Sequence, residues 1–133
     1  MYEQFSLVLM VNHACNLRCT YCYTGAKTHR PMSLAVARQS IAAAGRSIRP
    51  GGVLELGFFG GEPLIEAELI LAAIRQAELI CGERGVELRL GLTTNGTLTD
   101  YAAWRAMTWP GLMLHVSHDG VPAVHDLHRV SGW

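Results

Sequence analysis

Short apolar stretches alternate along this chain with segments of helical periodicity, and this alternation constrains the fold more than any other feature. Four stretches have the length and composition of strands, at residues 5–11, 53–59, 86–92 and 112–116. The first is almost continuously aliphatic, which is typical of a strand buried on both faces of a parallel sheet. Strands that alternate with helices predict an α/β fold with a parallel sheet and right-handed crossovers.

Three segments between the predicted strands have the periodicity of amphipathic helices. They run from Ser33 to Ile48, from Ile65 to about Gly82, and from Thr99 or Asp100 past Trp104. Ser33 is a suitable N-cap, and the first helix is expected to end before residues 50–52. Cys81 lies in the second helical pattern and is expected in the core. With 133 residues the chain has room for about one domain, residues 1–133.

A polar or glycine-rich motif follows each predicted strand. The motifs are C-N-L-R-C-T-Y-C at 15–22, G-G-E-P at 60–63, T-T-N-G at 93–96 and S-H-D-G at 117–120. Ligands of parallel α/β folds bind at the carboxyl ends of the strands, either in a barrel mouth or at a switch point of an open sheet. We therefore expect the four loops to converge on one face.

Cys15, Cys19 and Cys22 stand within eight residues. Three thiolates on one short loop can hold three irons of a [4Fe–4S] cube and leave the fourth iron open to an outside ligand. Cys81 is the only other cysteine. A zinc site that adds a histidine such as His13 is the alternative, although zinc modules usually pair their cysteines in two separate knuckles. A disulfide framework does not fit, because three clustered cysteines cannot all pair.

The cysteine run and the three later motifs resemble the radical S-adenosylmethionine (SAM) superfamily, whose C-x-x-x-C-x-aromatic-C signature Tyr21 completes. The resemblance is to the peptide- and protein-modifying branch, similar to anaerobic sulfatase-maturating enzymes. It implies a [4Fe–4S] cluster whose open iron SAM chelates. It also implies reductive cleavage of SAM to a 5′-deoxyadenosyl radical, which abstracts hydrogen from a peptide or protein substrate. The electron comes from a donor such as flavodoxin or ferredoxin.

The resemblance also assigns residues to the SAM site. Gly60, Gly61 and Glu62 are expected to receive the amino group of SAM, and Tyr21 to line the adenine side. Asn95 belongs to a T-N-G run that recurs at this strand end in the family. Without the family context, the G-G-E-P motif is interpreted as a strand-to-helix turn and the T-T-N-G motif as an Asx turn.

The segment after the fourth strand extends the likeness. In the family's S-x-D-G segment the serine contacts SAM, which implies a contact for Ser117 and an acceptor role for Asp119. The run H-D-L-H-R at 125–129 resembles the family's H-D-x-x-R, in which the arginine, here Arg129, reaches the SAM carboxylate. A helix cap and a solvated helix start are the plain alternatives.

Composition narrows the range of partners. Lysine and arginine together number 11, as do aspartate and glutamate, so no charge excess points to nucleic acid. The apolar runs are too short for a membrane span, and the N-terminus lacks the order of a signal peptide. We therefore expect a cytoplasmic protein with no nucleic-acid or membrane partner.

The family fold is larger than this chain. We expect the N-terminal four β/α units of a partial (β/α)6 TIM-like barrel, with the later strands missing and an incomplete core domain over residues 1–133. The strand at 112–116 would then leave a bare apolar edge. The alternative function is a non-catalytic metal- or cluster-binding interaction module, with a structural zinc or an inert iron–sulfur site.

Overall fold

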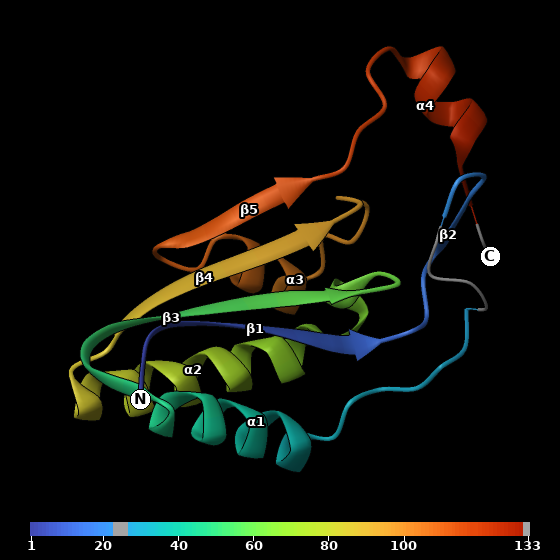
Figure 1. Cartoon of the computed structure of the whole chain (residues 1–133). Coiled ribbons are helices and arrows are strands. Elements are labelled where there is room, and N and C mark those ends of the chain that lie inside the picture. Colours follow the sequence, from blue (N-terminus) through green and yellow to red (C-terminus); the bar gives the residue numbers. More distant parts are fainter. Residues whose placement is uncertain (23–26, 132–133) are drawn as a thin grey trace.

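A sheet of four parallel strands forms the centre of the molecule (Figure 1). A computed structural model describes residues 1–22 and 27–131. The strands lie in the order β1 (Tyr2–Asn12), β3 (Ile48–Gly60), β4 (Glu87–Thr94) and β5 (Leu112–Val116). All three pairings are parallel, so the carboxyl ends of the strands share one edge of the molecule. The predicted α/β class and parallel sheet are confirmed.

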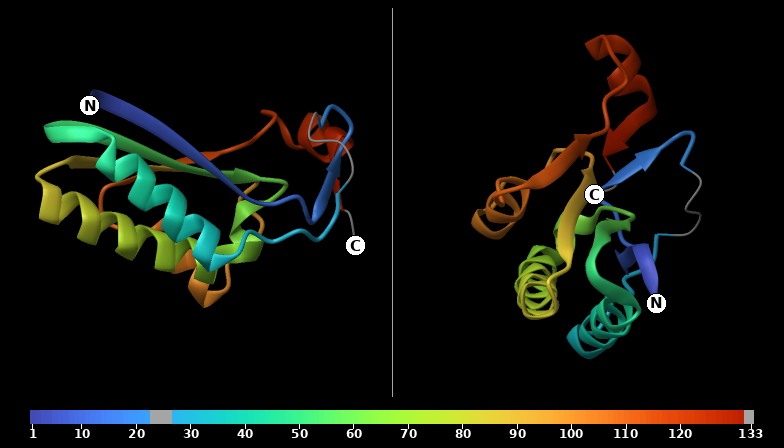
Figure 2. Two further views of the ribbon diagram at one scale, coloured as in Figure 1. Left: turned by 60° about the horizontal axis from the view of Figure 1, so that its bottom comes forward. Right: turned by 60° about the vertical axis from the view of Figure 1, so that its left-hand side comes forward.

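Helices cover one face of this sheet (Figure 2). They are α1 (Leu34–Arg46), the short 3₁₀ helix η1 (Pro63–Glu66), α2 (Ala67–Arg84) and α3 (Tyr101–Met107). Because side chains alternate along a strand, Leu56, Phe58 and Leu92 point toward the helices and meet Ile70 and Ile74 in the core. Within residues 1–22 and 27–131, no helix is both long and apolar enough to span a bilayer.

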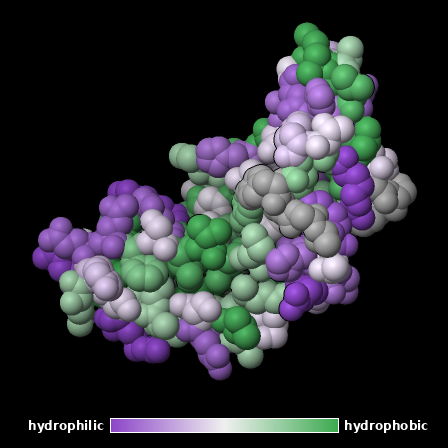
Figure 3. Space-filling model, turned by 45° about the vertical axis from the view of Figure 1, so that its right-hand side comes forward, coloured by the Kyte–Doolittle hydropathy of each residue, from purple (hydrophilic) through white to green (hydrophobic). Residues whose placement is uncertain are grey.

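The opposite face of the sheet carries no helix among the described residues, and several of its apolar side chains are exposed. Val8 is 65% exposed and Met113 is 64% exposed. They lie at the two ends of a register row whose middle members are Gly57 and Gly91. Figure 3 shows hydrophobic residues gathered in the middle of one side of the molecule, with hydrophilic residues around them.

A second, two-stranded sheet lies beyond the carboxyl ends of the main strands (Figure 1). Its members are β2 (Leu17–Cys19) and β6 (Arg129–Ser131), which pair antiparallel, and α4 (Pro122–His128) leads directly into β6. Cys19 is the register partner of Arg129. The cysteine loop and the last described residues are thus held side by side, a pairing that the sequence patterns did not predict.

The predicted end of the first helix was wrong. The helix ends at Arg46, and Ile48 is already the first residue of β3. Residues 50–52 lie inside β3, where the register with β1 is interrupted and Gly51 adopts a φ of +85°. Residues 49–52 are therefore an irregular part of a long strand, opposite Glu3 alone, and glycine can take the conformation that this requires.

Other expectations at single residues are confirmed. Ser33 is the N-cap of α1, and its side chain accepts a hydrogen bond from Val36 N–H. Asp100 caps α3 in the same way through Ala103 N–H. Cys81 is 2% exposed in the core. The fourth predicted strand coincides with β5.

Candidate functional site

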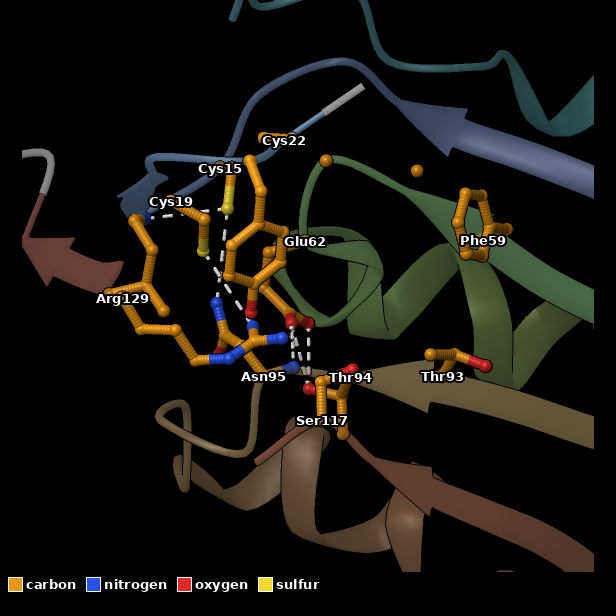
Figure 4. A pocket seen from close by; sticks show the side chains of 14 residues that line it. Cys15, Cys19, Cys22, Phe59, Glu62, Thr93, Thr94, Asn95, Ser117 and Arg129 are labelled. Atoms are coloured by element: carbon orange, nitrogen blue, oxygen red, sulfur yellow. Dashed lines mark hydrogen bonds between the residues drawn. The ribbon is translucent and has the colours of Figure 1, made fainter. Parts of the chain in front are cut away.

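A pocket of about 130 Å³ lies at the carboxyl ends of the parallel strands (Figure 4). The loops after β1, β3, β4 and β5 all contribute to it, as expected, and the first residue of β6 completes it. Its lining consists of Cys15, Leu17, Cys19, Tyr21, Cys22, Phe59, Gly60, Gly61, Glu62, Thr93, Thr94, Asn95, Ser117 and Arg129. Asp119 is the one predicted site residue that does not line the pocket.

The cysteine loop begins at Asn12, a fully buried polar residue at the end of β1. Its side-chain oxygen accepts hydrogen bonds from Ala14 N–H and Arg30 N–H, both at 3.0 Å. Its amide nitrogen donates to Glu66 at 2.6 Å. Asn12 therefore fixes both ends of the segment that contains the cysteines, because buried polar groups hold their partners strongly.

Each of the three cysteine sulfurs has a nitrogen donor nearby. The Cys15 sulfur accepts from Leu17 N–H at 3.4 Å, and the Cys22 sulfur lies 2.7 Å from Lys27 Nζ. The Cys19 sulfur lies 3.7 Å from Arg129 Nη1. Burial raises the pKa of the Cys19 thiol, and the Arg129 charge lowers it in part. Such donors favour the thiolate form, which is the form that binds metal.

The arrangement of the three cysteines fits an iron–sulfur cluster better than a single metal ion. Among residues 1–22 and 27–131, no three His, Cys, Asp or Glu side chains are placed to hold a single metal ion. Zinc would require such a group, with sulfurs about 2.3 Å from one centre. Three cysteines that bind different irons of a cube need only line the same pocket, and Cys15, Cys19 and Cys22 do so.

The glycines of the turn after β3 allow close packing against the cysteine loop. Gly61 N–H donates to Asn12 O at 3.0 Å, and Glu62 N–H donates to Ala14 O at 2.8 Å. A side chain on Gly61 would collide with the Ala14 carbonyl, and one on Gly60 with the Asn12 carbonyl. Glycine is therefore required here by backbone approach, whatever contact these residues make with a ligand.

Glu62 is fully buried, and its carboxylate joins the turn after β3 to the end of β4. It accepts hydrogen bonds from Leu64 N–H at 2.8 Å, from Asn95 N–H at 2.7 Å and from the Thr94 hydroxyl. Burial raises the pKa of this carboxyl above its usual value, and the hydrogen bonds offset that rise only in part. Its oxygens are thus already engaged by protein donors at the wall of the pocket.

Asn95 forms the Asx turn that its motif allowed. Its Oδ1 accepts from Thr97 N–H at 3.0 Å and from the Thr97 hydroxyl at 2.7 Å. Its amide nitrogen donates to Asn16 Oδ1 at 2.8 Å and lies 3.8 Å from the Cys15 sulfur. Asn95 therefore connects the end of β4 to the cysteine loop.

Arg129, Asp119 and Tyr21 form one interacting group. Arg129 Nε lies 3.2 Å from Asp119 Oδ2, and the Tyr21 hydroxyl donates to the same carboxylate at 2.8 Å. The Arg129 guanidinium also lies 5.4 Å from the centre of the Tyr21 ring. Neither Ser117 nor Asp119 caps α4, whose N-cap is Val121. Asp119 thus contacts two pocket-lining residues from outside the pocket.

Several residues of the site were not predicted. Asn12, Asn16 and Thr94 are buried polar residues at or just after the ends of strands. Leu17 and Thr93 belong to the motifs at 15–22 and 93–96 but were given no role, and Phe59 directly precedes the G-G-E-P motif; all three line the pocket. A polar residue at the carboxyl end of an apolar strand is the sequence signal that could have identified Asn12 and Thr94.

Comparisons with known proteins agree with this geometry. A sequence model of the radical SAM superfamily matches residues 9–131. The serine-type anaerobic sulfatase-maturating enzyme of Klebsiella aerogenes is 29% identical over 126 residues, covering 92% of this chain and 31% of that enzyme. The GTP 3′,8-cyclase of Pectobacterium atrosepticum is 32% identical over 139 aligned positions, covering 96% of this chain and 38% of the cyclase.

A solved structure shows the same fold. Native anSMEcpe with bound AdoMet (SAM) and the Kp18Cys peptide superposes with a TM-score of 0.78 at 24% identity, over 97% of this chain and 36% of that chain. This chain therefore spans about a third of the length of these relatives. Because the superfamily's sequence model covers residues 9–131 and the fold agrees with that of a structure that holds SAM, this chain belongs to the radical SAM superfamily.

Proposed function

We propose that this chain holds a [4Fe–4S] cluster on Cys15, Cys19 and Cys22, binds SAM in the adjoining pocket, and acts as part of an enzyme that modifies a peptide or protein. Superfamily membership implies both cofactors. When bound, they supply reductive cleavage of SAM to methionine and a 5′-deoxyadenosyl radical that takes a hydrogen atom from the substrate. The meeting of the cysteine loop with the ends of β3, β4 and β5 in one pocket carries the proposal.

Arg129 and Ser117 are the proposed partners of the SAM carboxylate. A guanidinium can bind a carboxylate through two parallel N–H donors, and a hydroxyl adds a third donor. The Arg129 side chain is largely buried, and its Nε forms an ion pair with Asp119 at 3.2 Å from outside the pocket, without the geometry of a hydrogen bond. Asp119 would thus orient Arg129 rather than contact SAM, because a carboxylate repels another carboxylate.

The turn after β3 is the proposed partner of the SAM amino group. Gly60 and Gly61 have no side chains to cover their backbone, so a carbonyl there can accept from an ammonium group. Glu62 supports this turn, since its carboxylate is held by donors of η1 and β4. Tyr21 lines the pocket with a ring that is suited to a purine face.

A peptide or protein is the proposed substrate class. The sulfatase-maturating relative and the solved structure with a bound peptide support this choice. An external one-electron donor, such as flavodoxin or ferredoxin, would reduce the cluster.

Anaerobic reconstitution with iron and sulfide tests the proposal. We expect about four irons and four sulfides per chain, and a visible or EPR spectrum that changes when SAM is added. After reduction with dithionite, methionine and 5′-deoxyadenosine should be released in equal amounts. A colourless zinc protein would contradict the proposal and support a structural metal site.

A further inference from the structure

The carboxamide of Asn95 has a fixed orientation beside the cysteine loop (Figure 4). Its oxygen accepts from the backbone N–H and the hydroxyl of Thr97, so its nitrogen must face the opposite way. That nitrogen donates to Asn16 Oδ1 at 2.8 Å and approaches the Cys15 sulfur to 3.8 Å. Both ends of the carboxamide are therefore engaged by the protein.

The Cys15 sulfur lies in an environment where such a donor has a large effect. Cys15 is 7% exposed, and its sulfur also accepts from Leu17 N–H at 3.4 Å. Hydrogen bonds to a charged sulfur are stronger than neutral ones, and low solvent access strengthens them further. Groups that hydrogen-bond to metal ligands orient those ligands, and hydrogen bonds to cluster sulfurs help to set the reduction potential.

We propose that Asn95 acts through Cys15 as a positioning residue and raises the reduction potential of the bound cluster, an inference that rests on the proposed function. One electron added to the cluster increases the negative charge on its thiolate ligands, and an N–H donor at one thiolate favours that reduced form. A direct SAM contact by the Asn95 side chain would require the carboxamide to leave Cys15 and Asn16.

Two variants and one control separate these roles. Asn95→Ala removes the donor, and Asn95→Asp keeps the Oδ1 that accepts from Thr97 but replaces the NH2 with a charged oxygen. Thr97→Val is the control, because it removes the hydroxyl's bonds to Asn95 and Asn16 while Thr97 N–H still donates to Asn95 Oδ1 and the Asn95 NH2 is retained. The measurement is an EPR-monitored redox titration of the reconstituted chain without SAM, followed by a separate SAM-binding titration.

We expect the ratio of reduced to oxidised cluster at a fixed potential to fall about tenfold in Asn95→Ala, which is the scale of one hydrogen bond to a charged group. For a one-electron couple this equals a shift of about 59 mV to more negative potential. Asn95→Asp should shift the potential further, because it places negative charge near the Cys15 sulfur. Iron content and SAM affinity should stay at the wild-type value, and Thr97→Val should keep the wild-type potential.

An unchanged potential in both Asn95 variants overturns the inference. Loss of the cluster in both variants also overturns it, because a residue that only tunes the cluster is not needed to hold it. Weakened SAM binding at unchanged potential would assign Asn95 to SAM instead. A wild-type chain that forms no [4Fe–4S] cluster overturns the proposed function and this inference together, whereas a cluster that does not respond to SAM overturns the proposed function alone.

Discussion

Asn12 and Glu62 show how single buried polar residues hold the loops of the pocket together. Asn12 binds the backbone on both sides of the cysteines, and Glu62 binds the end of β4. Each makes at least three hydrogen bonds, so neither leaves an unpaired buried group, which would be costly. The positions of the cysteine loop and of Asn95 therefore depend on the hydrogen bonds of these two buried side chains.

The three clustered cysteines should behave as one unit. Changing Cys15, Cys19 or Cys22 to Ala removes one of three ligands of the proposed cluster, and we expect each change to abolish the brown chromophore. Cys81 is buried in a separate part of the core, so Cys81→Ala should cost only about 1 kcal/mol of stability and leave iron content normal. Iron analysis after anaerobic reconstitution makes the comparison. Loss of iron in Cys81→Ala alone would refute the assignment.

Glu62 should make stability depend on pH. Burial raises its pKa above the usual 4.5, with partial opposition from the hydrogen bonds of Asn95, Leu64 and Thr94. The folded chain then keeps this proton to higher pH than the unfolded chain, so the contribution is full below pH 4.5 and is lost as pH rises through the folded pKa.

The variant Glu62→Gln does not titrate and lacks this dependence. The unfolding free energy of the wild type relative to Glu62→Gln should therefore decrease from about pH 4 to pH 7. Denaturant unfolding at several pH values measures it, with Glu83→Gln at an exposed position as the control. A constant difference across this range would show that the carboxyl of Glu62 is not perturbed by folding.

For single residues, the sequence predicted which ones come together in the pocket but not how they contact one another. Cysteine spacing and the motifs after each strand placed all but one predicted residue in the pocket lining. The exception, Asp119, is a partner of Arg129 and Tyr21, and its contact with Tyr21 joins residues that are 98 positions apart in the chain. Polar residues such as Asn16 were missed for the same reason. The roles of the predicted pocket residues in binding SAM remain predictions.

Among the elements, β3 and its turn do the most to position the site. The strand is longer than predicted because Gly51 permits a bulge where the sequence suggested a helix end. The turn that follows it packs its backbone directly on the cysteine loop. The pairing of β2 with β6 was not predicted, since three-residue strands are too short to show an alternating pattern.

Gly61, in the turn after β3, and Gly91, in β4, should respond differently to the same substitution. In Gly61→Ala the new methyl would meet the carbonyls of Ala14 and His13, which are backbone atoms and cannot rotate away. We expect a loss of about 1–3 kcal/mol of stability. Gly91→Ala, in β4, meets nothing within 4 Å and should be neutral or gain up to about 0.5–1 kcal/mol. Denaturant unfolding of both variants measures these changes, and equal destabilisation would contradict the packing described for Gly61.

The whole molecule is an open sheet whose parallel order could be predicted from the alternation of strands and helices alone. The alternation does not indicate whether the two edge strands of the sheet have further partners. Among the described residues, β1 and β5 each have one side without a partner strand. The chain spans about a third of the length of its relatives. We therefore propose that shielding a radical from water needs further structure beyond these four strands.

The exposed edge at β5 should make the isolated chain associate with itself. Met113 is 64% exposed on this edge strand, and a lysine there should reduce association because charges on edge strands oppose pairing. Leu79→Lys is the control, since Leu79 is 58% exposed on the helical side in α2. Sedimentation velocity over a range of concentrations measures association. A wild-type chain that stays monomeric throughout would contradict the prediction.

The pairing of β2 with β6 has a consequence for the order of events during synthesis. Cys19 and Arg129 are separated by 110 residues, yet they are register partners. At about 5–20 residues per second, the cysteine loop leaves the ribosome roughly 5–20 s before its partner strand does. During that interval the loop is open to delivery of iron and sulfide. Once β6 docks, one side of the loop is closed, so we expect the proposed cluster to load more readily before β6 docks than after.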